Sequence, residues 1–444
     1  MNIQLSEHFT NKKLLKFTLP SIAMMIFTSI YMIVDGLFVS NFAGKTAFAA
    51  VNLIMPVLMI LGTIGYMFGT GGTALVSKVY GEGDKEKANK YFSLIVYFAF
   101  VVGVVLSALV FVFIRQISAM LGAKGELLND CVIYGQIVVA TMPFFILQVM
   151  FQSFFSAAEK PMLGLIITLS AGLTNIVFDM VLVLLLPAQY KLMGAAIATT
   201  LSQTVGGVVP LIYFFKKNKS ILRLGKTEYN GKAILKACTN GSSEFMTNLA
   251  LSVVGILYNF QLINFAGENG LASYGVMMYI STIFSAVFFG FTMGVAPIVG
   301  YNFGAKNYSE LKNLRKKSLW IIGVFGVAML LLAQVFAVAV SKLFVGYDKV
   351  LLLLTINGFR IFAISFIFAG FGIFVSGFFT ALNDGLTSAL IAFLRTFVFQ
   401  VIAILTLPNM LGIDGVWISV VVAEFMSLVL GAFFLIIKKK KYNY

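Results

Sequence analysis

The stretch YMIVDGLFVSNFAG, Tyr31 to Gly44, places one carboxylate, Asp35, inside the first long apolar run of the chain. Its last eleven residues align without a gap on LYNFQLINFAG, Leu257 to Gly267, where Tyr258 stands in place of Asp35. The alignment indicates an internal duplication in which only the first copy carries the acid. An ionisable side chain at membrane depth is costly, so Asp35 is a functional candidate by default.

The composition is that of a polytopic membrane protein. Of 444 residues, 60% are hydrophobic and 11% are charged, whereas soluble domains are about 25% charged. The 32 Lys and Arg outnumber the 17 Asp and Glu; we interpret this excess as a topology signal and expect no nucleic-acid partner. Two cysteines do not suggest a disulfide framework. The only histidine, His8, precedes the first apolar run, which argues against histidine proton relays inside the membrane.

Twelve apolar runs are long enough to cross a bilayer, which takes about 20 residues. The first run lacks a cleavage site, so we interpret it as a span and not as a signal peptide. The sequence therefore predicts an all-α membrane protein, and Pro143 is among the prolines expected to bend a span. The predicted spans are 14–40, 46–78, 88–114, 130–157, 161–186, 191–216, 234–264, 270–302, 315–341, 350–380, 384–407 and 412–437.

The distribution of Lys and Arg predicts the orientation of the chain. With the amino terminus inside, 24 of them fall in inner segments, 6 in outer loops and 2 within spans. Positive charge collects on the cytoplasmic side of membrane proteins. We therefore expect a multi-pass protein of the cytoplasmic membrane with both termini in the cytoplasm.

Further sequence matches support the duplication. FFSA at Phe154 matches FFTA at Phe378, and YGEGDK at Tyr80 resembles YNFGAK at Tyr301. Six spans per copy is an even number, so both copies have the same orientation. We expect parallel repeats, related by an axis along the membrane normal, with a central cavity between them.

The longest polar segment, Lys216 to Lys232, follows the sixth predicted span. It divides the chain into an N-terminal six-helix bundle at 1–215, a basic cytoplasmic linker at 216–233 and a C-terminal six-helix bundle at 234–444.

Polar groups of the first half are expected in one layer, on three different spans. Asp35, Asp179 and Thr199 lie roughly 8–12 Å from the outer ends of their spans, by the helical rise. Asn175 precedes Asp179 by four residues and shares its helix face. Their oxygen atoms suit Na⁺, and two nearby carboxylates equally suit a shared proton. The alternative is structural, with Asp179 bonded to backbone and Asn175 contributing only to helix packing.

The second half carries a different set of buried ionisable groups. Two acids are matched by two bases, so we expect a buried charge network of internal ion pairs. Its members are Glu244, Arg360, Arg395 and Glu424. The alternative is that Glu244 or Glu424 lines the cavity and contacts a cationic substrate. In either case the first half holds unbalanced negative charge, which attracts cations.

Methionine and aromatic side chains can repack around varied ligands. The candidates for lining a substrate cavity are Met24, Tyr31, Met55, Phe144, Phe145, Phe154, Glu244 and Tyr258.

The GTGGTAL stretch at Gly69 lacks the ending of a phosphate loop, so we expect no nucleotide and no cofactor besides the coupling ion.

Several motifs together resemble the multidrug and toxic compound extrusion (MATE) family, most closely its DinF-like branch. The resemblance covers essentially the whole chain. It rests on Pro20 with VDGLFVSNFAG, the glycine-rich pattern from Gly69 to Ala88, FFSAAEKP from Phe154, TNIVFD from Thr174, GAAIATTLS from Gly194 and GFTMGVAPIVGYNFGAKN from Gly290.

The resemblance implies a drug/cation antiporter in which Asp35 and Asp179 couple to H⁺ or Na⁺. Asn175 and Thr199 match positions proposed as ion ligands, although Thr200 stands beside the latter. Glu244 departs from some relatives, so no coupling role is transferred to it.

The sequence is compatible with three functions. The leading hypothesis is secondary efflux of cationic amphipathic compounds by a monomer embedded in the lipid bilayer. The first alternative is a flippase for lipid-linked precursors, whose anionic cargo would need Arg360 and Arg395. The second is a membrane-embedded enzyme, which the lack of clustered His, Asp or Cys argues against.

Overall fold

The computed structural model describes residues 3–39 and 44–444, and the side chain of Asp35 lies outside the described part. The described residues form helices joined by short loops. The N-terminal half holds α1 Asn11–Phe38, α2 Lys45–Gly81, α3 Lys85–Met120, α4 Gly125–Ala140, α5 Met142–Ala157, α6 Pro161–Leu185, η2 Ala188–Tyr190 and α7 Lys191–Phe215. The C-terminal half holds α8 Gly231–Gly304, α9 Tyr308–Val345, α10 Lys349–Phe362, η3 Ala363–Ser365, α11 Phe366–Ala381, α12 Gly385–Phe393, η4 Leu394–Val398, α13 Phe399–Leu411, α14 Ile413–Ile437 and α15 Lys439–Tyr442.

The helices account for the twelve predicted spans. Among the described residues, 10 helical segments are long and apolar enough to cross a membrane, and α4 with α5 adds an eleventh span that is bent by 55° next to Pro143. The twelfth comes from α8, whose 74 residues contain a break at Gly267. A straight helix of that length would extend about 110 Å. Gly267 has φ 57° and ψ −145°, a conformation that glycine adopts most readily.

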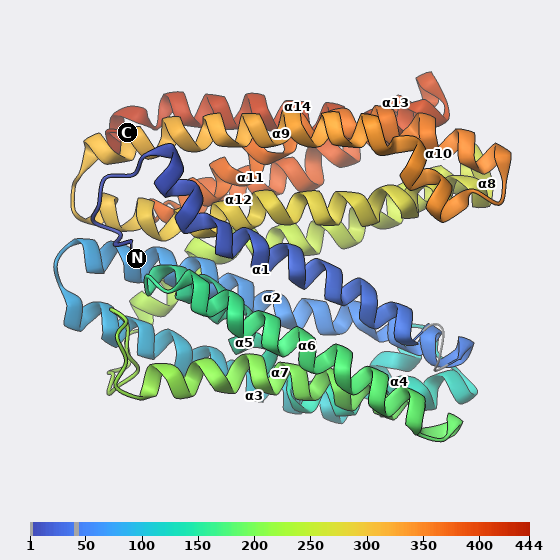
Figure 1. Cartoon of the computed structure of the whole chain (residues 1–444), viewed down its shortest axis with the longest axis horizontal. Helices are drawn as coiled ribbons and strands as arrows, with labels where there is room; N and C mark the ends of the chain where they lie inside the picture. The colour runs from blue at the N-terminus through green and yellow to red at the C-terminus, as the bar shows by residue number, and fades with distance from the viewer. Residues whose placement is uncertain (1–2, 40–43) are drawn as a thin grey trace.

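The two six-helix bundles lie against each other, and both chain termini lie at one end of the molecule, which we call the terminal face (Figure 1). The N-terminal bundle, blue to green, and the C-terminal bundle, yellow to red, each have their own apolar core. The start of the chain is an exception: Leu5, Phe9 and Phe17 pack in the core of the C-terminal bundle. Helix α1 therefore contacts both bundles.

Near the terminal face, α2 meets α8 along backbone contacts between glycines, which we call the glycine seam (Gly71, Gly81, Gly241 and Gly304). A Cβ added at Gly71 would lie 2.6 Å from the Gly241 nitrogen, and one at Gly304 would lie 2.8 Å from the carbonyl carbon of Lys78. Such separations leave no room for a side chain, so the two bundles are closed against each other at this end.

Two tyrosines that are equivalent in the sequence repeat meet at the same place. The rings of Tyr80 and Tyr301 lie with centroids 5.7 Å apart. A contact between equivalent residues is expected where two related halves meet at their symmetry axis. The duplication read from the sequence is thus visible as packing.

Candidate functional site

The layer predicted in the first half is built on α1, α6 and α7. Helices α1 and α6 approach closely at Gly172, where an added Cβ would lie 3.0 Å from Phe27 Cζ and 3.3 Å from Tyr31 Cδ1. Both helices start at the terminal face and run parallel (Figure 1). Four residues beyond Tyr31, the backbone of Asp35 is therefore level with the segment of α6 from Asn175 to Asp179.

Asn175 and Asp179 continue the α6 face that begins at Gly172, since residues three, four and seven apart share a helix face. Asp179 is 0% exposed and Asn175 is 2% exposed. A fully buried carboxylate within a membrane helix carries a large desolvation cost, which polar partners within the protein or a bound cation offset. This burial supports Asp179 as a coupling residue, and that role stays a prediction.

Thr199 lies at a matching height on α7, which runs antiparallel to α6. An added Cβ at Gly194 would lie 3.1 Å from Leu182 Cβ, so Thr199, five residues further on, is level with the middle of the Asn175–Asp179 segment. Its hydroxyl donates to the Ala195 carbonyl at 3.1 Å. The hydroxyl oxygen can still accept a hydrogen bond or bind a cation.

The predicted cavity residues fall into two groups in this conformation. Met24 and Phe154 are fully buried, and the ring of Phe154 packs against Phe92 with centroids 4.8 Å apart. The half-buried members are Tyr31, Met55, Phe144, Phe145 and Glu244, and Tyr258 belongs with the buried ones. Contact of any of these residues with a substrate stays a prediction.

In the second half, the position equivalent to Asp35 carries a tyrosine whose hydroxyl is hydrogen-bonded within the protein. Tyr258, the counterpart of Asp35, is 1% exposed and donates its hydroxyl to Gln400 Oε1 at 2.7 Å. Its ring stacks on Tyr274 with centroids 5.4 Å apart and an interplanar angle of 5°. Sequence reasoning missed Tyr274 and Gln400, although a glutamine inside an apolar span was a visible signal. The two halves therefore differ in charge at equivalent positions.

The expected network of four buried charges is a single ion pair. Arg395, in a π-helical turn, donates Nε and Nη2 to the two carboxylate oxygens of Glu424 at 2.9 and 3.0 Å. Gly372 makes room for it, because an added Cβ there would lie 2.8 Å from Arg395 Cδ. This fork geometry is the strong form of an Arg–carboxylate contact.

The other two members depart from the prediction. Arg360 is exposed on α10, and neither it nor Glu244 forms an ion pair with a described residue. The physical reason is direction: α10 turns the Arg360 side chain away from the pair, which sequence spacing does not reveal. Glu244 is half-buried on α8.

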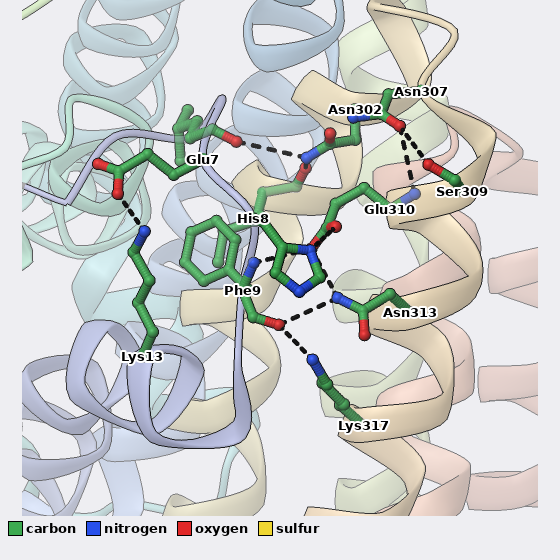
Figure 2. Close-up of polar contacts among 12 residues, drawn as sticks. Glu7, His8, Phe9, Lys13, Asn302, Asn307, Ser309, Glu310, Asn313 and Lys317 are labelled. Atoms are coloured by element: carbon green, nitrogen blue, oxygen red, sulfur yellow. Dashed lines mark hydrogen bonds and ion pairs between the residues drawn. The ribbon is translucent and has the colours of Figure 1, made fainter.

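The amino-terminal segment Leu5–Phe9 closes the terminal face from outside the spans, and sequence reasoning missed it. Figure 2 shows His8 and Phe9 lying against the start of α9, where Glu310 accepts from the Phe9 nitrogen at 3.0 Å and lies 2.6 Å from His8 Nδ1. The Leu5 nitrogen donates to Glu159 of the N-terminal bundle at 2.7 Å. This segment therefore ties the two bundles together.

Two parallel six-helix repeats that are closed against each other at one end are the architecture of a two-repeat membrane transporter. The first repeat carries the fully buried Asp179, whereas Glu424, a buried acid of the second repeat, is paired with Arg395. The sequence model of the MatE family matches residues 20–181 and 245–405, once in each repeat. The chain belongs to the MatE family.

Curated relatives agree with this assignment, and a solved structure shares the fold. The chain is similar to the multidrug export protein MepA of Staphylococcus haemolyticus (strain JCSC1435), 26% identical over 95% of this chain and 92% of that protein. It is 27% identical to MepA of Staphylococcus aureus (strain NCTC 8325 / PS 47), over 93% of this chain and 90% of that protein. An outward-facing MATE transporter of the MOP superfamily superposes with a TM-score of 0.92 at 22% identity, covering 99% and 98% of the two chains.

Proposed function

We propose that this protein is a secondary active antiporter that exports cationic amphipathic compounds in exchange for H⁺ or Na⁺. The observation that carries the proposal is Asp179, a fully buried carboxylate on the α6 face that packs against α1, level with the backbone of Asp35. The names of the staphylococcal relatives, multidrug export proteins, support the substrate class.

In the proposed cycle, a cation that enters from outside neutralises the acidic layer and competes there with the exported compound. H⁺ would bind Asp35 or Asp179, because two carboxylates in one layer of a low-dielectric site can share a proton. Na⁺ would bind the oxygen atoms of Asp179, Asn175 and Thr199, which are the donors that a hard cation prefers. Competition for one site couples the two fluxes.

Alternating access requires the glycine seam and the Leu5–Phe9 segment to separate, because both join the two bundles at the terminal face. We further propose that this face is cytoplasmic, that the membrane is the cytoplasmic membrane and that the protein acts as a monomer. The excess of Lys and Arg in the segments expected on this side supports the orientation.

The test is efflux of a fluorescent lipophilic cation from energised cells under an imposed pH or Na⁺ gradient. We expect gradient-driven efflux in the wild type and its loss in Asp35→Asn and in Asp179→Asn. Glu86→Gln, at an exposed surface pair, is the matched control and should transport normally. Efflux that persists in both Asn variants would contradict the proposed coupling.

The flippase alternative receives less support. An anionic cargo needs free cationic side chains in the cavity, and Arg395 is already neutralised by Glu424. A folded Arg360→Ala, Arg395→Ala double variant that lost all activity would favour this alternative.

A further inference from the structure

An open pocket of about 500 Å³ lies at the terminal face, outside the predicted transport site. It is formed where the first turns of α9 meet the end of α14, α15 and the last residue. Its lining residues are Lys312, Arg315, Lys316, Leu319, Leu435, Lys439 and Tyr444.

The pocket has four cationic lining side chains and no acidic one. Lys312, Arg315 and Lys316 share one face of α9 by their spacing, and Lys439 lies opposite them. None of these four cations forms an ion pair with a residue that the structure describes. Nearby Lys438 offers a contrast, because its Nζ lies 3.4 Å from Asp384 Oδ2. The charge of the pocket is therefore available to an anion.

The wall formed by Tyr444 is held rigidly. The Tyr444 side chain is buried, its hydroxyl donates to the Leu435 carbonyl at 3.2 Å, and its ring packs edge-on against Phe378 at 5.1 Å. The guanidinium carbon of Arg315 lies 5.2 Å from the centre of the Tyr444 ring. This cation–π contact orients Arg315 before any ligand binds.

The pocket lies where lipid-facing surface gives way to charged surface. One turn beyond Lys316, Trp320 is 60% exposed, and Ile436, next to Leu435, is 74% exposed. An exposed tryptophan beside lysines marks the height of the lipid headgroups in a membrane protein, and exposed Ile436 belongs to the adjoining apolar surface. Leu319 and Leu435 add apolar lining on the membrane side of the cations.

We propose that this pocket binds the phosphate headgroup of an anionic phospholipid from the leaflet at the terminal face. Basic pockets between membrane helices bind such headgroups. A lipid fits better than a soluble phosphate because the cations stand directly above exposed apolar side chains, where acyl chains lie. The inference does not depend on which compounds are transported.

The experiment measures binding of phosphatidylglycerol to the purified full-length protein in neutral detergent, by native mass spectrometry and by the shift in thermal unfolding. The pocket variant is Lys312→Gln, Lys316→Gln, Lys439→Gln. The charge-matched control replaces three exposed linker lysines, Lys216→Gln, Lys217→Gln and Lys219→Gln, which lie outside the pocket. A Lys→Arg version of the pocket variant restores the charge.

We expect phosphatidylglycerol to bind about a hundredfold more weakly to the pocket variant, since each of the three lysines near anionic lipid contributes about a fivefold effect. The linker control and the Lys→Arg version should bind as the wild type does. Lys316→Gln alone should weaken binding about fivefold, which keeps the test valid if the triple variant folds poorly.

Three outcomes would overturn the proposal. Equal weakening in the pocket and linker variants would show a diffuse charge effect without a site. Equal binding of phosphatidylethanolamine would show that the anionic headgroup is not recognised. Inorganic phosphate that stabilises the protein as strongly as phosphatidylglycerol, at the same concentration, would identify a soluble anion as the ligand.

Discussion

Replacing Gly304 by alanine should open the terminal face. The added Cβ would lie 2.8 Å from the carbonyl carbon of Lys78 and would overlap its oxygen, at least about 0.7 Å inside the roughly 3.5 Å at which heavy atoms pack. The neighbour is backbone and cannot rotate away, so the helices must separate. Overpacking of this kind costs about 1–3 kcal/mol, and Lys78 belongs to the opposite bundle.

The cost falls only on conformations in which the two bundles touch at the seam. A penalty of about 3 kcal/mol shifts an equilibrium on the order of a hundredfold, so Gly304→Ala should populate a state with the terminal face open. Gly255→Ala is the matched control, because Gly255 also lies in α8, on the span before the Gly267 break, and an added Cβ there meets nothing within 4 Å.

The assay is an inter-spin distance measured between labels on exposed residues of the two bundles. Cysteines replacing Lys85 and Lys306 carry the labels, in a chain without the native Cys131 and Cys238. We expect Gly304→Ala to gain a longer-distance population that the wild type and the control lack. Identical distance distributions in all three proteins would refute the inference that the seam holds this end closed.

Three further predictions concern charges outside the acidic layer. Glu424→Gln leaves Arg395 buried without its anion and should lower the free energy of unfolding by about 3–5 kcal/mol, seen as a lower midpoint of thermal unfolding. Replacing both Arg395 and Glu424 by apolar residues should recover most of this stability, and no recovery would contradict the pairing. Glu310→Gln weakens the hydrogen bond that the Phe9 nitrogen donates and should lower the free energy of opening the Leu5–Phe9 segment by about 1–3 kcal/mol. The measurement is faster amide hydrogen exchange of this segment, and unchanged exchange would contradict the prediction. Burial alone would raise the pKa of the Asp384 carboxyl, but hydrogen bonds from the Tyr442 hydroxyl and from Thr387 outweigh burial and lower the pKa. The ionised carboxylate therefore stabilises the fold above the ordinary pKa of about 3.9, and this stabilisation is lost as the pH falls through the lower pKa of the folded state. Asp384→Asn should reduce the loss of thermal stability on acidification, and identical pH profiles of variant and wild type would refute this.

Much of the architecture could be predicted because it depends on local composition. Each apolar run must satisfy its own backbone hydrogen bonds inside a membrane, so run length alone predicted the spans. The acid at Asp179 was found because an ionisable residue in such a run is rare. The break at Gly267 falls in the gap between the predicted spans 234–264 and 270–302, although its positive φ could not be predicted.

Side-chain partnerships could not be predicted in the same way. Sequence reasoning expected Arg360 and Arg395 to behave alike, yet one is exposed and the other is held by Glu424. Which way a side chain points depends on the rotation of its helix about its own axis. That rotation is decided by packing against other helices, through contacts such as the one between Gly372 and Arg395.

The sequence by itself therefore determined the membrane class, the twelve spans, the duplication and the asymmetry between Asp35 and Tyr258, because hydropathy and repeats are read one segment at a time. Only the tertiary structure decided the glycine seam, the docking of Leu5–Phe9 on Glu310, and the basic pocket that joins Lys312 to Lys439. These features bring together residues more than a hundred positions apart. Their contacts arise from the packing of helices in space, which no local pattern encodes.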